Sequence, residues 1–249
     1  MINRMLQSLA LAALVTIAPA AAAQDAVSAA QVATLKAALE KPDRGLTIES
    51  VEVSEAPGLF AVQFANGPVV YATGDGKHFV VGDLHRVEGG QFVNLTERRR
   101  DVERLARMDA VKTEEMIVFS PEGETRTHIS VFTDVTCFYC QKLHLEVPEL
   151  NKRGVEVRYL AYPRAGLKSD GYNKLATAWC ADDPQTTLTK LKAKESVKEK
   201  ICEPNPIAGQ FELGQAVGVS GTPAIVTEDG KLIPGYRPAA DLVGVLGLD

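Results

Sequence analysis

The chain has 249 residues, a formal net charge of −5 and four cysteines, all of which lie in its second half. A mildly acidic chain is a poor partner for nucleic acid, so we exclude nucleic-acid binding as its main function. Its length allows one large domain or two modest ones.

The N-terminus has the pattern of a secretory signal peptide. Arg4 precedes an apolar run at residues 9–18, and Pro19 precedes the small residues 20–23. We therefore expect residues 1–23 to be cleaved and exclude them from the fold. The apolar run is shorter than the roughly 20 residues that cross a bilayer, although a retained N-terminal anchor is the alternative. The mature protein is expected to be soluble and exported.

Residues 24–95 are predicted to form a small antiparallel α+β domain. A helix at 26–40 is followed by short strands, separated by Pro-Gly, Asn-Gly and Gly-Asp-Gly turns. The strands are expected at 47–53, 59–64, 68–73 and 78–81. A domain of this size without a disulfide or metal has a marginal core. It therefore packs on the rest of the chain or pairs with a second copy through an exposed sheet edge, and both remain open.

Residues 96–113 are predicted to be a linker built on one helix. Thr96 is the expected N-cap, and only Val102, Leu105 and Met108 form an apolar stripe. A charged helix with so narrow a stripe is typical of a solvated connector between domains. Acidic residues are interleaved with its arginines, which argues against a nucleic-acid patch.

Residues 114–249 alternate between strand and helix patterns. Strands are expected at 116–119, 127–132, 155–162, 222–226 and 232–234, and helices after the second strand as far as 152 and at 175–180, 187–194, 206–217 and 238–246. The strand–helix–strand unit implies a parallel pair with a right-handed crossover. This order, with a Gly-Thr-Pro segment before the fourth strand, is that of a thioredoxin fold with a helical insertion.

Two cysteines three residues apart, Cys137 and Cys140, lie where a strand hands over to a helix. Unpaired N–H groups and the helix dipole stabilise a thiolate at such a position. We interpret Cys137 as the nucleophile and Cys140, one turn further in and less exposed, as the resolving thiol. A static disulfide or half of a zinc site are the alternatives. The other cysteines, Cys180 and Cys202, are 22 positions apart with no histidine nearby, which is not zinc-knuckle spacing.

Several segments resemble the DsbC-type periplasmic disulfide isomerases (the DsbC/DsbG family). They are Thr133–His144, Tyr159–Arg164, Ala178–Ala181, Gly218–Ala224 and Pro234–Pro238. The match covers essentially the whole mature chain in order, including the small N-terminal domain and the charged linker. It is therefore far more specific than a Cys-x-x-Cys pair alone.

The resemblance implies several features that periodicity cannot supply. Residues 24–95 would be a dimerisation module, and the homodimer would bind misfolded, disulfide-containing proteins in a cleft. Thr222-Pro223 would be a cis-proline loop facing the cysteine pair, and it would contact substrate together with Phe138 and Tyr139. Cys180 and Cys202 would form a structural disulfide, with a second redox pair as the alternative.

Two positions depart from the family's pattern. The family's isomerases usually enclose Gly-Tyr between the cysteines, whereas Phe138-Tyr139 stands here, and Gln141 replaces a frequent histidine. Residues beside the cysteines tune thiolate stability and reduction potential, so the redox poise of this pair is open. His144 matches the family but lies roughly 10 Å along the helix from Cys137. We therefore expect it to be structural or to modulate the site indirectly.

The expected activity is rearrangement of non-native disulfides by thiol–disulfide exchange, without a metal or organic cofactor. A membrane-embedded thiol reductase of the DsbD type would keep the cysteine pair reduced. The alternatives are a dithiol reductase or oxidase of different redox poise, and a non-catalytic periplasmic chaperone whose dithiol is incidental.

Overall fold

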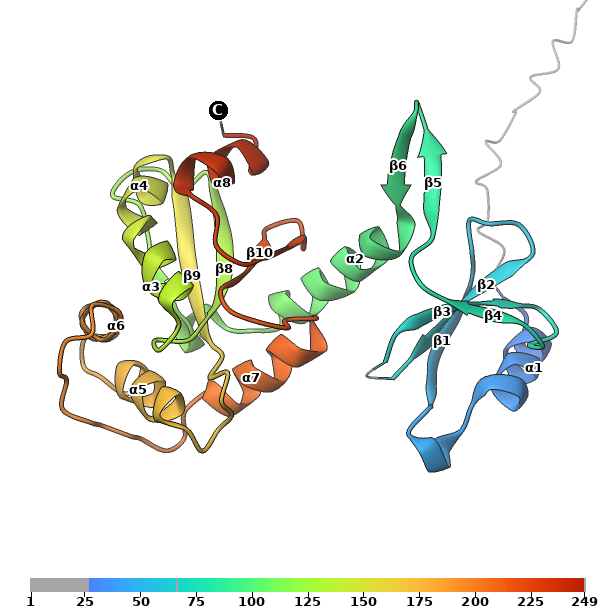
Figure 1. The fold of residues 1–249 in the computed structure, drawn as a ribbon, viewed down its shortest axis with the longest axis horizontal. Coiled ribbons are helices and arrows are strands. Elements are labelled where there is room, and N and C mark those ends of the chain that lie inside the picture. The colour runs from blue at the N-terminus through green and yellow to red at the C-terminus, as the bar shows by residue number, and fades with distance from the viewer. Residues whose placement is uncertain (1–26, 66, 249) are drawn as a thin grey trace, which may run out of the picture. The chain divides into compact units, whose positions relative to one another are not determined.

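The computed structural model describes residues 27–65 and 67–248 of the chain (Figure 1). These residues form two compact units, the first ending at Gly82 and the second beginning at Asp83. The predicted signal peptide, residues 1–23, lies outside the described residues, as does Asn66 of one predicted turn. No helix in the described ranges is long and apolar enough to cross a membrane.

The first unit is one helix on a four-stranded antiparallel sheet. Its elements are α1 (Ala29–Leu39), the short 3-10 turn η1 (Pro42–Arg44), β1 (Ile48–Val53), β2 (Leu59–Phe64), β3 (Val69–Thr73) and β4 (Phe79–Val81). The strands pair in chain order, so β1 and β4 are the two edges of the sheet. Ser28 begins α1 by accepting a hydrogen bond from the Gln31 N–H. The predicted helix and four strands of this unit are confirmed, with ends that differ by a few residues.

The core of the first unit is small. Leu35 of α1 packs on Val62 of β2 and Ala72 of β3, and all three are fully buried. Gly76, in the turn before β4, has a φ of 67° and lies against α1, where a Cβ would collide with the side chain of Ala38. A positive φ and so close an approach both require glycine. The turn is therefore fitted to the helix it covers.

The second unit contains the cysteines. Its elements are β5 (His85–Glu88), β6 (Gln91–Asn94), α2 (Leu95–Asp109), the 3-10 turn η2 (Thr113–Glu115), β7 (Ile117–Phe119), β8 (Thr127–Thr133), α3 (Phe138–Leu145), α4 (Val147–Lys152), β9 (Val155–Ala161), α5 (Asp170–Trp179), α6 (Pro184–Lys192), α7 (Ile207–Ala216), β10 (Ala224–Thr227), β11 (Leu232–Pro234) and α8 (Ala239–Val245). A five-stranded sheet in the order β11-β10-β8-β9-β7 forms its centre.

The central pair of strands is parallel, as the strand–helix–strand pattern predicted. β8 runs beside β9 with Thr127 opposite Val155 and Thr133 opposite Ala161, and α3 and α4 form the crossover. Because the two strands are parallel, their C-terminal ends lie side by side. The end of β8 therefore carries the segment that leads to Cys137.

Alternation of side chains along the strands divides the core into two faces. Ile129 and Val131 of β8 face a cluster that α3, α4, α5, α6 and α8 cover. Phe132 of β8 and Leu160 of β9 face the opposite cluster, which α7 and Met108 of α2 cover. The cysteine-bearing helix thus lies on the face that also holds α6.

The helix after the cysteines is shorter than predicted. The prediction ran it without interruption to Lys152, but the structure has two helices that meet at Glu146. Pro148, in the first turn of α4, has no N–H to bond the carbonyl of His144, which breaks the helical ladder there. The β5–β6 hairpin was not predicted. It turns through Gly89 and Gly90, which both have positive φ.

The linker helix α2 is not the solvated connector that its charge predicted. Asn94, rather than Thr96, is its N-cap, since the Asn94 side chain accepts a hydrogen bond from the Glu97 N–H. Arg104 is only 4% exposed. Its guanidinium donates to the carbonyl of Val217, the C-cap of α7, at 3.0 Å and to that of Gly230, in the turn between β10 and β11, at 2.7 Å.

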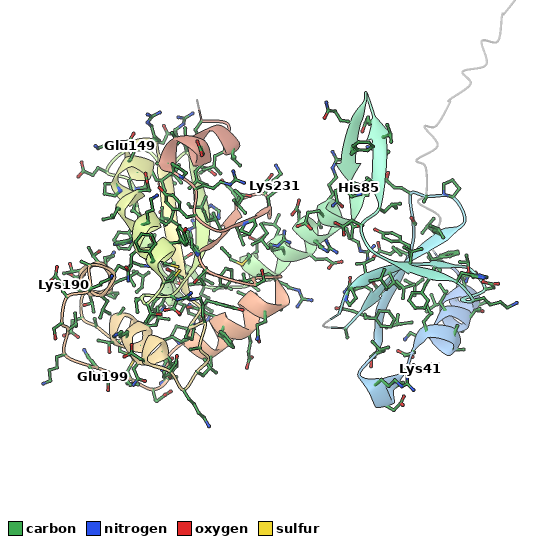
Figure 2. All side chains as sticks on the ribbon, in the orientation of Figure 1. Lys41, His85, Glu149, Lys190, Glu199 and Lys231 are labelled. Atoms are coloured by element: carbon green, nitrogen blue, oxygen red, sulfur yellow. A yellow bond between two sulfur atoms is a disulfide. The ribbon has the colours of Figure 1, made fainter. Side chains whose placement is uncertain are left out.

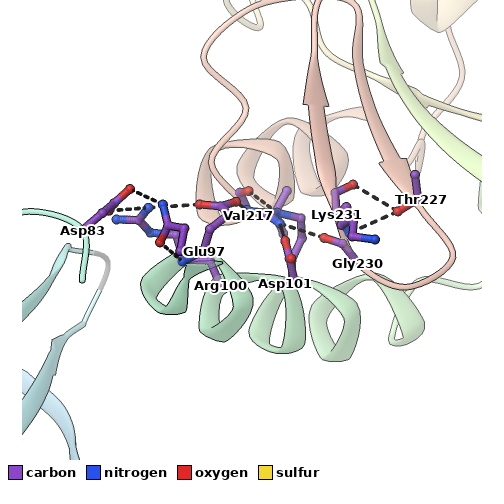
Figure 3. A network of polar contacts seen from close by, with 10 residues as sticks. Asp83, Glu97, Arg100, Asp101, Val217, Thr227, Gly230 and Lys231 are labelled. Carbon is purple, nitrogen blue, oxygen red and sulfur yellow. Dashed lines mark hydrogen bonds and ion pairs between the residues drawn. The ribbon is translucent and has the colours of Figure 1, made fainter. Parts of the chain in front are cut away.

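An ion-pair network surrounds this guanidinium. Arg104 pairs with Asp101 at 2.7 Å and with Glu97 at 3.0 Å, and Arg100 joins Glu97 to Asp83 (Figure 3). Gly230 has a φ of 84°, and a Cβ there would collide with the backbone of Asp101. The α2 helix is therefore fixed to the rest of the second unit by a buried arginine whose donor nitrogens are all bonded.

We predict that Arg104→Ala lowers the free energy of unfolding by about 3–5 kcal/mol, because it leaves buried carbonyls and the carboxylate of Asp101 without their donor. Urea titration followed by circular dichroism measures the loss. Arg107→Ala, at an exposed position of the same helix, is the control and should change stability by about 0.5 kcal/mol or less. Equal stability of the two variants would contradict the anchoring role of Arg104.

Candidate active site

The cysteine pair lies where β8 gives way to α3. Thr133 is the last residue of β8, and Cys137 is the N-cap of α3, with an extended backbone. Cys140 lies in the first turn of the helix. The exposed N–H groups of this turn and the positive end of the helix dipole therefore lie beside the sulfur of Cys137.

A buried carboxylate shapes the loop between the strand and the helix. Asp134 is 2% exposed, and its Oδ1 accepts hydrogen bonds from the backbone N–H and the hydroxyl of Thr136. Its Oδ2 accepts from the N–H of Arg164 at 3.0 Å and from the Arg164 guanidinium at 3.3 Å. Burial opposes ionisation of Asp134, but these hydrogen bonds outweigh it and lower the pKa of the carboxyl. The loop is thus held from both sides by one charged group.

The two thiols are free, buried and electrostatically unlike. Cys137 is 3% exposed and Cys140 1%, so both residues are almost fully buried and Cys140 is the less exposed of the two, as predicted. A hydrogen bond from the Cys140 thiol, against the opposing effect of burial, lowers the pKa of Cys137 to about 5, and contacts with Thr222 and the charge of Arg164 add to the shift. Burial, and the hydrogen bond to Cys137, raise the pKa of Cys140 far above its usual range. At neutral pH the pair therefore consists of a thiolate on Cys137 and a thiol on Cys140.

The loop that faces the pair contains the predicted cis peptide bond. The bond between Thr222 and Pro223 is cis, and the carbonyl oxygen of Thr222 lies 3.2 Å from the Sγ of Cys137. The carbonyl of Pro223 accepts a hydrogen bond from the N–H of Gly235, after β11. Two residues separated by 85 positions in the sequence, Cys137 and Thr222, are thereby brought into contact.

Aromatic rings surround the entrance to the pair. Phe138 is 65% exposed and Tyr139 55%, and their rings meet edge to face at 5.4 Å. Tyr236 stacks on Tyr139 at 6.4 Å, and Lys142 lies over the ring of Tyr236. The hydroxyl of Tyr236 donates to Glu146 at 2.6 Å, which fixes the ring of Tyr236. An apolar surface thus adjoins a buried thiolate.

His144, on the buried side of α3, belongs to a polar cluster and does not contact Cys137. The Thr189 hydroxyl donates to the Gln185 carbonyl, so the Nε2–H of His144 donates to Thr189, and its Nδ1 accepts from the Tyr159 hydroxyl. Burial, and then the charge of Lys192, lower the pKa of His144 to about 3. His144 is therefore neutral at physiological pH and holds α3 to α6 and β9.

The remaining cysteines are bonded to each other. A disulfide joins Cys180, the C-cap of α5, to Cys202, in the segment that precedes α7. This is the pairing that the resemblance implied. Closing a loop of this length stabilises a fold by roughly 3 kcal/mol in the chain-entropy model.

Several residues at the site were not identified from the sequence. Asp134 and Arg164 were visible only as parts of resembling segments, because their pairing across 30 positions depends on the tertiary fold. The Gln141 side chain donates to the carbonyl of Val135 at 2.8 Å and so ties α3 to the loop before it. Lys192 lies near the end of an amphipathic helix, where a lysine is ordinarily expected to face solvent, so the pattern gave no sign of its burial.

Comparison with known families and proteins agrees with this geometry. Residues 113–248 match the thioredoxin-like domain, and residues 19–97 match the disulfide bond isomerase protein N-terminal domain. The thiol:disulfide interchange protein DsbC of Escherichia coli (strain K12) is 38% identical over 208 residues, which cover 83% of this chain and 85% of that protein. The protein of the same name from Haemophilus influenzae is 32% identical, over 88% and 93% of the two chains. The chain belongs to the DsbC family.

Solved structures of other disulfide interchange and related proteins share the fold of this DsbC-family chain. The crystal structure of a disulfide interchange protein from Neisseria gonorrhoeae is 29% identical and covers 55% of this chain and 96% of that one, with a TM-score of 0.50. A linker-deletion mutant of Proteus mirabilis ScsC, at 17% identity and a TM-score of 0.53 over 61% of this chain and 82% of that one, shares the fold.

We predict that iodoacetamide alkylates Cys137 with a pH midpoint near 5, because the thiolate is stabilised well below the usual value of about 8.5 for a free thiol. Mass spectrometry of the reduced protein across a pH series measures the rate at each sulfur. The Cys137→Ala variant is the control, and its Cys140 should stay unreactive at neutral pH because burial keeps it protonated. A midpoint like that of free cysteine, or no reaction at all, would contradict the assignment of the nucleophile.

Proposed function

We propose that this DsbC-family protein is a periplasmic disulfide isomerase and reductase, which rearranges non-native disulfides through Cys137 and Cys140. The observation that carries this proposal is the placement of the pair, with Cys137 at the start of α3 opposite the cis Thr222–Pro223 bond and Cys140 buried in the first turn of the helix. The surroundings lower the pKa of Cys137 and raise that of Cys140. A thiolate of low pKa is both available for attack and a good leaving group. Such a sulfur can enter a substrate disulfide and leave it again.

The reaction begins with attack of the Cys137 thiolate on a substrate disulfide. A bond forms between the Cys137 Sγ and one substrate sulfur, the substrate S–S bond breaks, and the other substrate sulfur departs as a thiolate. A second substrate thiolate then attacks the mixed disulfide, forms a new substrate S–S bond and returns Cys137 to its ionised state. Electrons and protons balance over the cycle, so rearrangement consumes no reductant.

When the second substrate thiol does not arrive, Cys140 completes the reaction instead. It loses its proton, attacks the Cys137 Sγ and releases a reduced substrate, which takes up a proton at the departing sulfur. The enzyme is left with a Cys137–Cys140 disulfide. A membrane-embedded thiol reductase of the DsbD type then supplies two electrons to restore the dithiol.

The surface beside Cys137 suits an unfolded polypeptide. Phe138 and Tyr139 expose apolar area next to the sulfur, and such area attracts side chains that a correctly folded protein buries. The backbone of Thr222, beside the cis bond to Pro223, would pair with an extended substrate strand. We assign these four residues to substrate binding. The bulky Phe138 would favour substrates with apolar residues beside their disulfides.

The first unit is assigned to dimerisation through its β4 edge. Phe79, Val80 and Val81 are 55%, 62% and 62% exposed, although they form an edge strand. A short apolar edge with unpaired backbone groups favours pairing with another strand. The small core of the unit also favours stabilisation by a second copy. A homodimer joined along β4 satisfies both requirements.

Export to the periplasm is supported by two features of the chain. Residues 1–23 have the composition of a cleavable signal peptide. The Cys180–Cys202 disulfide suits an oxidising compartment, where such bonds persist. In that compartment misfolded proteins with wrong disulfides are the natural substrates.

Refolding of a scrambled multi-disulfide protein tests the proposed activity. We predict that Cys137→Ser abolishes the recovery of native substrate, since no other free thiol can form the mixed disulfide at neutral pH. Cys140→Ser should keep part of the activity, because substrate thiols still release Cys137. Recovery with Cys137→Ser equal to that of the parent would disprove the mechanism.

A variant lacking both thiols separates this enzyme from a holdase. Its suppression of aggregation of a reduced, disulfide-free protein measures chaperone activity alone. If that variant also rescued the scrambled substrate, the dithiol would be incidental. The redox equilibrium of the pair with glutathione distinguishes an isomerase from an oxidase of different poise.

We predict that Val80→Glu converts the dimer to monomers, because it places a charge in the apolar β4 edge where two strands would pair. Analytical ultracentrifugation of the mature protein measures the mass. Val53→Glu, at a position 53% exposed on the opposite edge strand β1, is the matched control and should leave the dimer intact. A monomeric parent, or a dimer insensitive to Val80→Glu, would refute the interface.

A further inference from the structure

A lysine is buried underneath the cysteine pair. Lys192, the last residue of α6, is 4% exposed. Its Nζ donates to the hydroxyl of Thr133 at 2.7 Å and lies 3.5 Å from the carbonyl oxygen of Cys140. It also lies 5.0 Å from the centre of the Tyr159 ring. The ammonium is therefore within the protein, between the end of β8 and the first turn of α3.

The fold does not require a cation at this position. The neighbouring residues Leu188 and Leu191 of α6 are buried and apolar, and Lys190 of the same helix reaches solvent (Figure 2). A buried ammonium loses its hydration and costs stability unless a charge compensates it. The contacts of Lys192 are a hydroxyl, a carbonyl and a ring, with no ion pair to a carboxylate of the described residues. Its counter-charge must therefore come from a nearby charged group that is not one of these three contacts.

The groups that face Lys192 identify that counter-charge. They are Cys140 and Cys137 on α3, Asp134 in the preceding loop, His144 further along α3, and Tyr159 on β9. His144 is neutral, and burial keeps Tyr159 protonated by raising the pKa of its hydroxyl. Asp134 is already occupied by Arg164 and Thr136. The dithiol is therefore the anionic group whose charge Lys192 can stabilise.

We propose that Lys192 is a positioning residue of the redox site, a fixed buried cation that stabilises the thiolate of the reduced Cys137–Cys140 pair and so sets its redox poise. This assignment rests on the proposed thiol–disulfide activity and names a residue that controls it. The pKa of Lys192 agrees with it. Burial lowers that pKa to about 8, while the charges of Cys140, Cys137 and Asp134 limit the fall.

The charge balance of oxidation explains the effect on poise. When glutathione disulfide oxidises the pair, the Cys137–Cys140 bond forms and the glutathione S–S bond breaks. The two molecules of reduced glutathione that form need two protons. Cys140 supplies one of them, and the solvent supplies the other, because Cys137 is already a thiolate. One negative charge disappears from beside Lys192. A cation there therefore favours the reduced protein over the oxidised one.

The same linkage acts on the lysine. If the ammonium stabilises the thiolate, the thiolate must raise the pKa of the ammonium by an equal free energy. Lys192 is then more basic in the reduced protein than in the oxidised one. A lysine that only filled space would have the same pKa in both states.

The test compares Lys192→Met with the control Lys190→Met, in the full-length mature protein. Methionine keeps the length of the side chain and removes the charge. At pH 7 the ratio of dithiol to disulfide at fixed glutathione poise should fall on the order of tenfold in Lys192→Met, and the pKa of Cys137, followed by thiolate absorbance, should rise by about one unit. Lys190→Met should match the parent in both. Lys192→Met should also melt at a higher temperature, since a buried charge has been removed.

An unchanged glutathione equilibrium in folded Lys192→Met, with or without a change in melting temperature, would overturn the proposal. A measurement on the parent keeps the proposal testable if that variant does not fold. The ¹³Cε shift of Lys192, titrated in the reduced and oxidised proteins, should give a pKa about one unit higher in the reduced state, and equal values would refute the role. Failure of the parent to refold scrambled substrate would count against the isomerase activity and leave these redox readouts intact.

Discussion

The redox chemistry of the site depends on a negative charge at the sulfur of Cys137, although that residue is almost entirely buried. Burial alone would keep the thiol protonated, so the surrounding groups must outweigh it. The start of α3, the thiol of Cys140 and the guanidinium of Arg164 all present positive charge or donors to this atom. Segments far apart in the chain place these groups. Asp134 holds Arg164, the parallel pair β8–β9 places the helix, and the cis-proline loop closes the opposite side.

The ionisation of Cys137 and the exposed surface beside it depend on different groups. The thiol of Cys140 and the carboxylate of Asp134 are buried, whereas the rings of Phe138 and Tyr139 face solvent. A change at Phe138 therefore alters the exposed surface and leaves the N–H groups at the start of α3 beside the sulfur. Tyr236, tethered to Glu146, extends that surface from a segment nearly a hundred residues away.

Local patterns in the sequence predicted those parts of the fold that local forces determine. The bounds of β2 and β11 agree with their alternating residues and flanking turns, and Cys137 lies at a helix start as predicted. The errors arose where a distant partner decides the outcome. The charged stripe of α2 indicated a solvated helix because nothing local reveals that Val217 and Gly230 accept hydrogen bonds from Arg104. Lys192 was missed for the same reason, since its partner Thr133 lies 59 positions away.

The two buried cations of the described second unit differ in how their charge is balanced, and this difference separates structure from function. Arg104 is saturated by two carbonyls and two carboxylates, so its surroundings are the same whatever the state of the active site. Lys192 contacts a hydroxyl, a carbonyl and a ring, and the compensating charge that we propose for it is that of the dithiol. A permanently paired charge stabilises one conformation. A charge whose partner appears and disappears with each redox cycle links the free energy of the fold to the oxidation state of the site, and only Lys192 is in that position.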